Sequence, residues 1–297
     1  MRKAMIVSIS MPPRLIEGIL PILEREAAGE GDLLQLPESC LGDYPVIEMG
    51  GEEMSRVSRI AKKYGKYIAF PVFRSSDRAK RLNTSVLFGR DGEIIGTYDK
   101  VYPYWGEFDL DPPATPGDDA PVFETDFGKI GFAICFDANY PEVWKRLSLG
   151  GAELVLWSSA YSAGTSLQAH ALNHNYTIIS STWIPDCVVY DINGKELFYG
   201  RGEDVMVRRT EVDLDRCIFH FDFNLERRDR LLAEHPEIEM DSVLEREKWF
   251  TLRSTVHGVS ARALAGEYGL EELGSYKRRS RREIDKMRGY QFAGKTL

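Results

Sequence analysis

Cysteine is scarce in this sequence: its 297 residues include only Cys40, Cys135, Cys187 and Cys217. Four scattered cysteines are too few for a disulfide scaffold. None lies in a C-x-x-C pair, so a structural zinc site is not expected. Reduced, intracellular thiols are the better interpretation. The remaining question is whether one of these thiols is a nucleophile.

Long hydrophobic runs are also missing. The longest apolar stretches have about eight residues, whereas a helix needs roughly 20 to span a bilayer. The N-terminus has a basic start and a short apolar run, but Pro12 and Pro13 interrupt it, unlike a signal peptide. We therefore expect a first β-strand here, no membrane partner and a cytoplasmic location.

Positive charge is in deficit, with 38 Lys and Arg against 46 Asp and Glu and a net charge of −8. An acidic chain lacks the basic footprint that nucleic acids require. The distribution is uneven: residues 243–297 hold 12 basic and 7 acidic side chains, so this part is +5 and the remainder is −13. We predict a catalytic domain over residues 1–242. Residues 243–297 are predicted to be a charged extension packed on the body or on a neighbouring subunit.

The basic cluster at residues 277–282 leaves an alternative open. It could bind nucleic acid or an acidic partner, as runs of like charge often do. Few aromatic residues are interleaved with the cluster, which favours a solvated helix or a packed arm instead.

Strand-like and helix-like segments alternate over the first two-thirds of the chain. Strands are expected at residues 4–10, 33–36, 67–73, 84–88, 94–98, 129–134, 154–157, 177–182, 187–190 and 196–199. Helices are expected at residues 15–27, 54–64 and 167–175, with a further one beginning at Pro141. Turns at residues 89–92 and 191–194 form hairpins, so the sheets cannot be purely parallel. The pattern predicts a mixed-sheet α/β protein with its helices outside.

Three apolar strands each lead into a chemically useful residue: Glu38, Lys100 and Cys135. Strand ends gather functional side chains in α/β proteins, so the three could converge. An ammonium favours a thiolate, and a carboxylate can take the thiol proton. Each residue alone is equally typical of a structural role, such as a buried thiol or a surface lysine. Spacing by itself therefore leaves the triad open.

The motifs around these residues resemble those of the nitrilase superfamily of carbon–nitrogen hydrolases. The glutamate motif is Leu36-Pro37-Glu38, the lysine motif is Gly96-Thr97-Tyr98-Asp99-Lys100, and the cysteine motif is Gly131-Phe132-Ala133-Ile134-Cys135-Phe136-Asp137. The order Glu, Lys, Cys is also that of the family. The resemblance covers roughly residues 4–235.

The resemblance implies an α-β-β-α sandwich, with two mixed sheets face to face and helices outside. It implies Cys135 as nucleophile, Glu38 as general base and acid, and Lys100 as oxyanion stabiliser, helped by the backbone N–H of Phe136. Glu107 matches a second family glutamate that positions substrate and supports the lysine. The family uses no metal and no organic cofactor. Its members commonly pair through helices near the cysteine, so a homodimer or larger homo-oligomer is implied.

Two departures from the family pattern are informative. Phe136-Asp137 follows the cysteine where many nitrile-cleaving members have Trp-Glu, which favours the amidase and N-carbamoyl amidohydrolase branches. An Arg-Ala-x-Glu-Asn segment is replaced by His170-Ala171-Leu172-Asn173-His174. His170 and His174, one helical turn apart, could be metal ligands, but no third ligand is evident. His170 could alternatively be the base of a Cys-His pair.

Aromatic residues near the motifs suggest a substrate wall, and loop packing is the alternative for each. They are Tyr44, Tyr102, Tyr104, Trp105 and Tyr161. The sequence thus predicts a hydrolase that cleaves a non-peptide C–N bond of a small amide or N-carbamoyl compound with water. Acyl transfer to an amine, nitrile hydrolysis and a non-enzymatic binding scaffold remain the alternatives.

Overall fold

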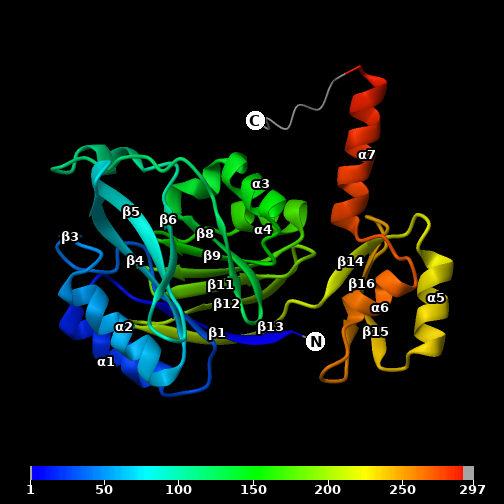
Figure 1. Cartoon of the computed structure of the whole chain (residues 1–297), viewed down its shortest axis with the longest axis horizontal. Coiled ribbons are helices and arrows are strands. Elements are labelled where there is room, and N and C mark those ends of the chain that lie inside the picture. Colours follow the sequence, from blue (N-terminus) through cyan, green and yellow to red (C-terminus); the bar gives the residue numbers. More distant parts are fainter. Residues whose placement is uncertain (1, 290–297) are drawn as a thin grey trace. The chain divides into compact units, whose positions relative to one another are not determined.

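The computed structural model describes residues 2–289 and divides them into two compact units. Residues 4–212 form the larger unit. Residues 213–289, with Arg2 and Lys3, form the smaller one. Figure 1 draws both units.

The first sheet of the larger unit is mixed. Its strands are β1 (Lys3–Ser10), β2 (Leu33–Gln35), β3 (Val46–Ile47), β4 (Tyr67–Ser76), β5 (Ala79–Phe88), β6 (Ile94–Asp99) and β13 (Met206–Asp213). Their order is β13-β1-β2-β4-β5-β6, with β3 beside β4. Strands β1, β2 and β4 run parallel, whereas β4, β5 and β6 form antiparallel hairpins. The predicted hairpin turn at residues 89–92 joins β5 to β6.

The second sheet is mixed as well. Its strands are β7 (Val122–Thr125), β8 (Gly128–Ile134), β9 (Leu154–Ser159), β10 (Thr177–Thr182), β11 (Asp186–Tyr190) and β12 (Glu196–Arg201), in the order β12-β11-β10-β9-β8-β7. Strands β8, β9 and β10 are parallel. Their carboxyl ends therefore meet at one edge of the sheet.

Buried polar side chains join the facing surfaces of the two sheets. The hydroxyl of Ser181 on β10 donates to the carbonyl of Ile9 on β1 over 2.7 Å. Between β2 and β9, the side-chain amide of Gln35 donates to the carbonyl of Trp157 over 3.0 Å. Because these donors are buried, each contact satisfies a polar group that would otherwise be costly to desolvate.

Helices cover the outer face of each sheet (Figure 1). Helices α1 (Ile16–Ala27) and α2 (Glu52–Tyr64) lie on the first sheet, and α3 (Pro141–Gly150) and α4 (Thr165–His174) lie on the second. Buried residues of α2 recur at helical spacing: Met54, Val57, Ile60 and Ala61. They join a core that includes Val7, Leu34 and Ile68 of the sheet. The predicted α-β-β-α sandwich is confirmed.

The smaller unit has its own sheet and core. Strands β14 (Cys217–His220), β15 (Ile238–Leu244) and β16 (Trp249–Ser254) are antiparallel, in the order β14-β16-β15. Its helices are α5 (Leu225–Glu234), α6 (Ala261–Glu267) and α7 (Leu273–Met287). The buried core includes Phe219, Leu231, Phe250, Leu252 and Ala265.

The compact units divide at residues 212 and 213, whereas the charge pattern predicts a boundary at 242 and 243. The predicted boundary falls inside β15, which pairs with β16 in the core of the smaller unit. The basic cluster lies on α7. How the charged extension packs on the body or on a neighbouring subunit stays a prediction. Within residues 2–289, no helix combines the length and the apolar composition needed to cross a membrane.

Candidate active site

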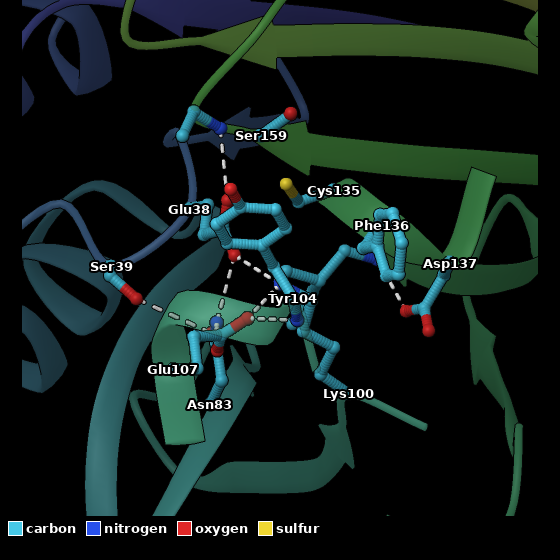
Figure 2. A network of polar contacts seen from close by, with 12 residues as sticks. Glu38, Ser39, Asn83, Lys100, Tyr104, Glu107, Cys135, Phe136, Asp137 and Ser159 are labelled. Atoms are coloured by element: carbon cyan, nitrogen blue, oxygen red, sulfur yellow. Dashed lines mark hydrogen bonds and ion pairs between the residues drawn. The ribbon is translucent and has the colours of Figure 1, made fainter. Parts of the chain in front are cut away.

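Glu38, Lys100 and Cys135 come from both sheets and line one cavity (Figure 2). Glu38 lies just after β2, Lys100 directly after β6 and Cys135 directly after β8. All three side chains are almost fully buried. The geometry that the strand ends predict is therefore present, while the catalytic roles of these residues stay predictions.

The Glu38 carboxylate is held by donors on both of its oxygens. Oε1 accepts from Nδ2 of Asn83 and from Nζ of Lys100, each over 2.8 Å. Oε2 accepts from the backbone N–H of Ala160 over 2.9 Å. These contacts fix the rotamer of the carboxylate beside the thiol, as a general base requires.

Lys100 is held between Glu38 and Glu107. Its Nζ lies 2.5 Å from Oε2 of Glu107, whose Oε1 accepts from Asn83 over 2.8 Å. Burial disfavours the ammonium, but the negative charges of Glu38 and Glu107 outweigh burial and keep the pKa of Lys100 above its ordinary value. The lysine therefore remains a cation that can face a developing negative charge.

Glu107 reaches this position because the long loop after β6 contains a short 3-10 helix, Trp105–Phe108. Oε2 of Glu107 also accepts from the backbone N–H of Tyr104 over 2.7 Å. The carbonyl of Glu107 accepts from Ala114 over 2.9 Å. These hydrogen bonds hold the loop, and with it the Glu107 carboxylate, in one position.

Cys135 occupies a sharp turn, with a φ of 46° that few non-glycine residues adopt. The residue is buried, with an exposed fraction of only 7%. Burial and then the charge of Glu38 raise the pKa of the thiol to about 12, and Lys100 lowers it only in part. The thiol is therefore protonated at neutral pH, and the adjacent carboxylate is the group available to take its proton.

Asp137 holds this turn together, and sequence analysis did not predict it as a site residue. Its carboxylate accepts from the backbone N–H groups of Ile134 and Tyr102, each over 2.9 Å, and from the Tyr98 hydroxyl over 2.6 Å. Burial raises the pKa of Asp137 to about 6, against the effect of these donors. The turn that carries Cys135 is thereby tied to the loop that follows Lys100.

The cavity has a volume of about 330 Å³. Its lining residues are Glu38, Ser39, Tyr44, Phe73, Asn83, Lys100, Tyr104, Gly106, Glu107, Leu110, Cys135, Ala160 and Trp183. Of the predicted substrate wall, Tyr44 and Tyr104 are present in this lining. Trp105 is 75% exposed and packs against Phe108 instead.

Phe136, Tyr161 and Tyr102 lie near the cavity without lining it. The Phe136 ring packs edge-on against Tyr104, with centroids 5.7 Å apart. Tyr161 packs edge-on against Trp157, and Tyr102 stacks on Tyr140. These three side chains make packing contacts, and a role for Phe136 and Tyr161 in binding substrate stays a prediction.

Asn83, Ala160 and Trp183 are lining residues that sequence analysis missed. Ala160 and Trp183 directly follow β9 and β10, at the same sheet edge as Cys135. The strand-end rule that selected Cys135 would have found them. Asn83 had a weaker signal, as a polar residue inside the otherwise buried strand β5.

His170 has a structural role and does not line the cavity. Its Nε2 lies 2.9 Å from the carbonyl of Ala138, and its ring stacks on Trp144 with centroids 4.3 Å apart. Burial lowers the pKa of His170 and so favours the neutral ring. These contacts contradict a Cys-His pair. Among residues 2–289, His170 and His174 belong to no cluster of potential ligands that could hold a metal ion.

An α-β-β-α sandwich whose two sheets bring a thiol, a carboxylate and an ammonium into one cavity is typical of a nitrilase-type protein. Residues 17–184 match the family model of carbon-nitrogen hydrolases, which is more than half of the chain. The chain belongs to this family.

Curated relatives support the assignment. The omega-amidase NIT2 of Xenopus tropicalis is 30% identical over 161 residues, covering 48% of this chain and 57% of the relative. The beta-ureidopropionase of Arabidopsis thaliana is 40% identical over 114 residues, covering 37% of this chain and 28% of the relative. The chain thus matches little more than half the length of the first of these relatives and less of the second.

Solved structures share the fold. A carbon-nitrogen hydrolase from Helicobacter pylori has a TM-score of 0.64 at 20% identity, covering 79% of this chain and 94% of its own. An amidase from Nesterenkonia sp. has a TM-score of 0.60 at 21% identity, covering 71% of this chain and 91% of its own. At this level of identity, the likeness concerns the fold alone.

Proposed function

We propose that the chain hydrolyses a non-peptide C–N bond of a small amide or N-carbamoyl compound through a thioester on Cys135. The observation that carries this proposal is the cavity itself, where a buried thiol meets a carboxylate and an ammonium that are 2.8 Å apart. This set supplies a nucleophile, a proton acceptor and a fixed positive charge.

In the first half-reaction, Glu38 accepts the thiol proton while Sγ of Cys135 attacks the carbonyl carbon of the substrate. The carbonyl oxygen becomes an oxyanion. Glu38 and Glu107 occupy two of the three N–H donors of Lys100, which leaves the third for this oxygen. The backbone N–H of Phe136 is the proposed second donor. Glu38 then passes its proton to the nitrogen, the C–N bond breaks, and ammonia or an amine leaves.

In the second half-reaction, Glu38 removes a proton from a water molecule that attacks the thioester carbon. The C–S bond breaks, the carboxylic acid leaves and the proton returns to Cys135. For an N-carbamoyl substrate, the acid released is carbamic acid. The same carboxylate thus serves as base, acid and base again, and general acid–base catalysis of this kind contributes about 10²- to 10⁴-fold.

The relatives support this chemistry without defining the substrate. They are named as an omega-amidase and a beta-ureidopropionase. A solved variant of the Nesterenkonia amidase carries the acetamide moiety of fluoroacetamide on its active-site cysteine. The Phe136-Asp137 pair after the cysteine favours amides and N-carbamoyl compounds over nitriles.

We also propose that two copies of the chain pair near α3 and α4. Light scattering of the purified chain tests this pairing.

The direct test is the Cys135→Ala variant, assayed for ammonia release from a panel of amides and N-carbamoyl compounds. We expect turnover to be abolished while the circular dichroism spectrum is unchanged. Cys187→Ala is the matched control, because Cys187 is a buried thiol outside the cavity. Turnover that persists in Cys135→Ala would overturn the proposal.

Acyl transfer on the same site is separated by product analysis. With hydroxylamine present, a hydrolase still releases mainly the free acid, because water reaches the thioester. A predominantly hydroxamate product, with little acid formed in the absence of an acceptor, would instead assign the chain as an acyltransferase.

A further inference from the structure

The wall of the cavity beyond the reacting groups is aromatic. The rings of Tyr44 and Trp183 stack with centroids 5.7 Å apart, and Phe73 packs edge-on against Tyr44 at 6.3 Å. Leu110 and Tyr104 complete the apolar surface. A volume of about 330 Å³ is at the small end of ligand pockets, which fits a substrate with one ring or a short branched chain.

The polar groups around Glu38 and Glu107 are engaged with one another. The indole N–H of Trp183 donates to the carbonyl of Glu38. The side-chain amide of Asn83 donates to both Glu38 and Glu107, and the backbone N–H of Ala160 donates to Glu38. These donors are already hydrogen-bonded to Glu38 and Glu107, so they are not available to a polar group at the far end of a substrate.

The charges of the cavity have an acidic excess, because Glu38 and Glu107 face the single cation Lys100. A substrate carboxylate would lose its hydration and gain no partner beyond a lysine that already has two. An unpaired ion in such a site is strongly disfavoured.

Arg81 is a cation that packs against this wall from outside the cavity. Its guanidinium lies over the Phe73 ring, 4.9 Å from the centroid. Its nitrogens donate to the backbone carbonyls of Tyr44, Asp111 and Pro112. Arg81 therefore supports the aromatic wall and is not part of the cavity lining.

We propose that the cavity selects amides whose acyl group is uncharged and apolar, an aryl or branched alkyl group, over amides that carry a carboxylate. This inference rests on the proposed function, which it extends to a substrate class. Each methylene that the wall buries contributes about 0.8 kcal/mol, so kcat/KM is expected to rise about fourfold per methylene until the cavity is full.

The experiment compares two primary amides of similar length, 3-phenylpropanamide and glutaramate. We expect kcat/KM for 3-phenylpropanamide to exceed that for glutaramate by at least about tenfold. Glutaramate that is hydrolysed as well as 3-phenylpropanamide would overturn the inference.

A binding experiment distinguishes a failure of this inference from a failure of the proposed function. Calorimetry with Cys135→Ala measures the affinity for the same amides without turnover. If the wild-type chain hydrolyses none of them but the variant still prefers 3-phenylpropanamide, the proposed function fails and the ligand class stands. Equal or weaker binding of the aromatic amide would overturn the ligand class whatever the turnover.

Two neighbouring aromatic residues provide a matched pair of variants. Tyr104 lines the cavity, whereas Trp105 does not. Tyr104→Ala is expected to lower kcat/KM for 3-phenylpropanamide by at least about tenfold and to affect acetamide much less, since acetamide has no ring to bury. Trp105→Ala should leave both values within about twofold, as is usual for exposed positions. Equal effects of the two variants on the aromatic amide would contradict the proposed wall.

Discussion

At the scale of single residues, the central feature is a thiol that is buried beside a carboxylate. Burial and the charge of Glu38 both disfavour the thiolate of Cys135, and the Lys100 ammonium offsets them only in part. The arrangement differs from a preformed thiolate, which would need a net positive surrounding. It suits a base that removes the proton only as the sulfur attacks.

This balance predicts the pH dependence of Cys135 alkylation. The thiol pKa of about 12 lies above the ordinary cysteine range, so the rate of inactivation by iodoacetamide should show no ionisation step near pH 8.5. Glu38→Gln removes a charge that raises this pKa, so an ionisation step should then appear at lower pH. The measurement is the rate of carbamidomethylation of the peptide containing Cys135 between pH 6 and pH 10. A step near pH 8.5 in the wild-type chain would contradict the account.

At the scale of elements, the site depends on backbone contacts that hold the end of β6. The N–H of Lys100 donates to the carbonyl of Asn83 on β5, and its carbonyl accepts from the N–H of Gly117, each over 2.8 Å. Gly117 lies so close that an added Cβ would be 2.2 Å from the carbonyl oxygen of Asp99. The returning loop therefore helps to fix the lysine from its backbone side.

Gly117→Ala tests this support. Because the clash is with backbone, the Asp99–Lys100 segment must shift, and we expect a loss of about 1–3 kcal/mol in the free energy of unfolding. We also expect a fall in kcat of at least about tenfold, because small displacements of a catalytic group are costly. Gly50→Ala is the control, since its Cβ would meet nothing within 4 Å. Urea unfolding and steady-state rates that are the same for both variants would refute the argument.

Most of the elements, but not all contacts between them, could be predicted from the sequence. Hydrophobic periodicity predicted most strands and helices of residues 4–200, because each buries one face or lies in a core. Strand ends and motifs predicted Glu38, Lys100 and Cys135. The contacts of Asn83 and Asp137 could not be predicted, because they depend on how two sheets and a loop meet. The boundary at residue 243 was predicted from the distribution of charge, and charged side chains lie mostly on the surface. The pairing of β15 with β16 depends instead on buried side chains such as Phe250, so charge did not reveal it.

At the scale of the whole molecule, the chain combines two units with separate cores. The larger unit carries the whole candidate site, since every residue lining the cavity lies between residues 38 and 183. The smaller unit buries Phe219, Phe250 and Leu252 in a core of its own. The two cores are therefore expected to respond separately to mutation.

Phe250→Ala tests this separation. Removing a fully buried phenylalanine costs about 3–5 kcal/mol, and the loss should be confined to the smaller unit. Hydrogen exchange measured by mass spectrometry is expected to show lower protection in β14, β15 and β16, with β8, β9 and β10 unchanged. An equal loss of protection in both groups of strands would show that the units unfold as one.

The central claim is that Cys135 forms the covalent intermediate, and trapping that intermediate tests it most directly. The chain is mixed with a substrate amide, quenched in acid within a turnover and digested, and the peptides are weighed. The account predicts that the peptide containing Cys135 gains the mass of the acyl group and that Cys135→Ala gains none. An acyl group on another residue, or sustained turnover by Cys135→Ala, would contradict it.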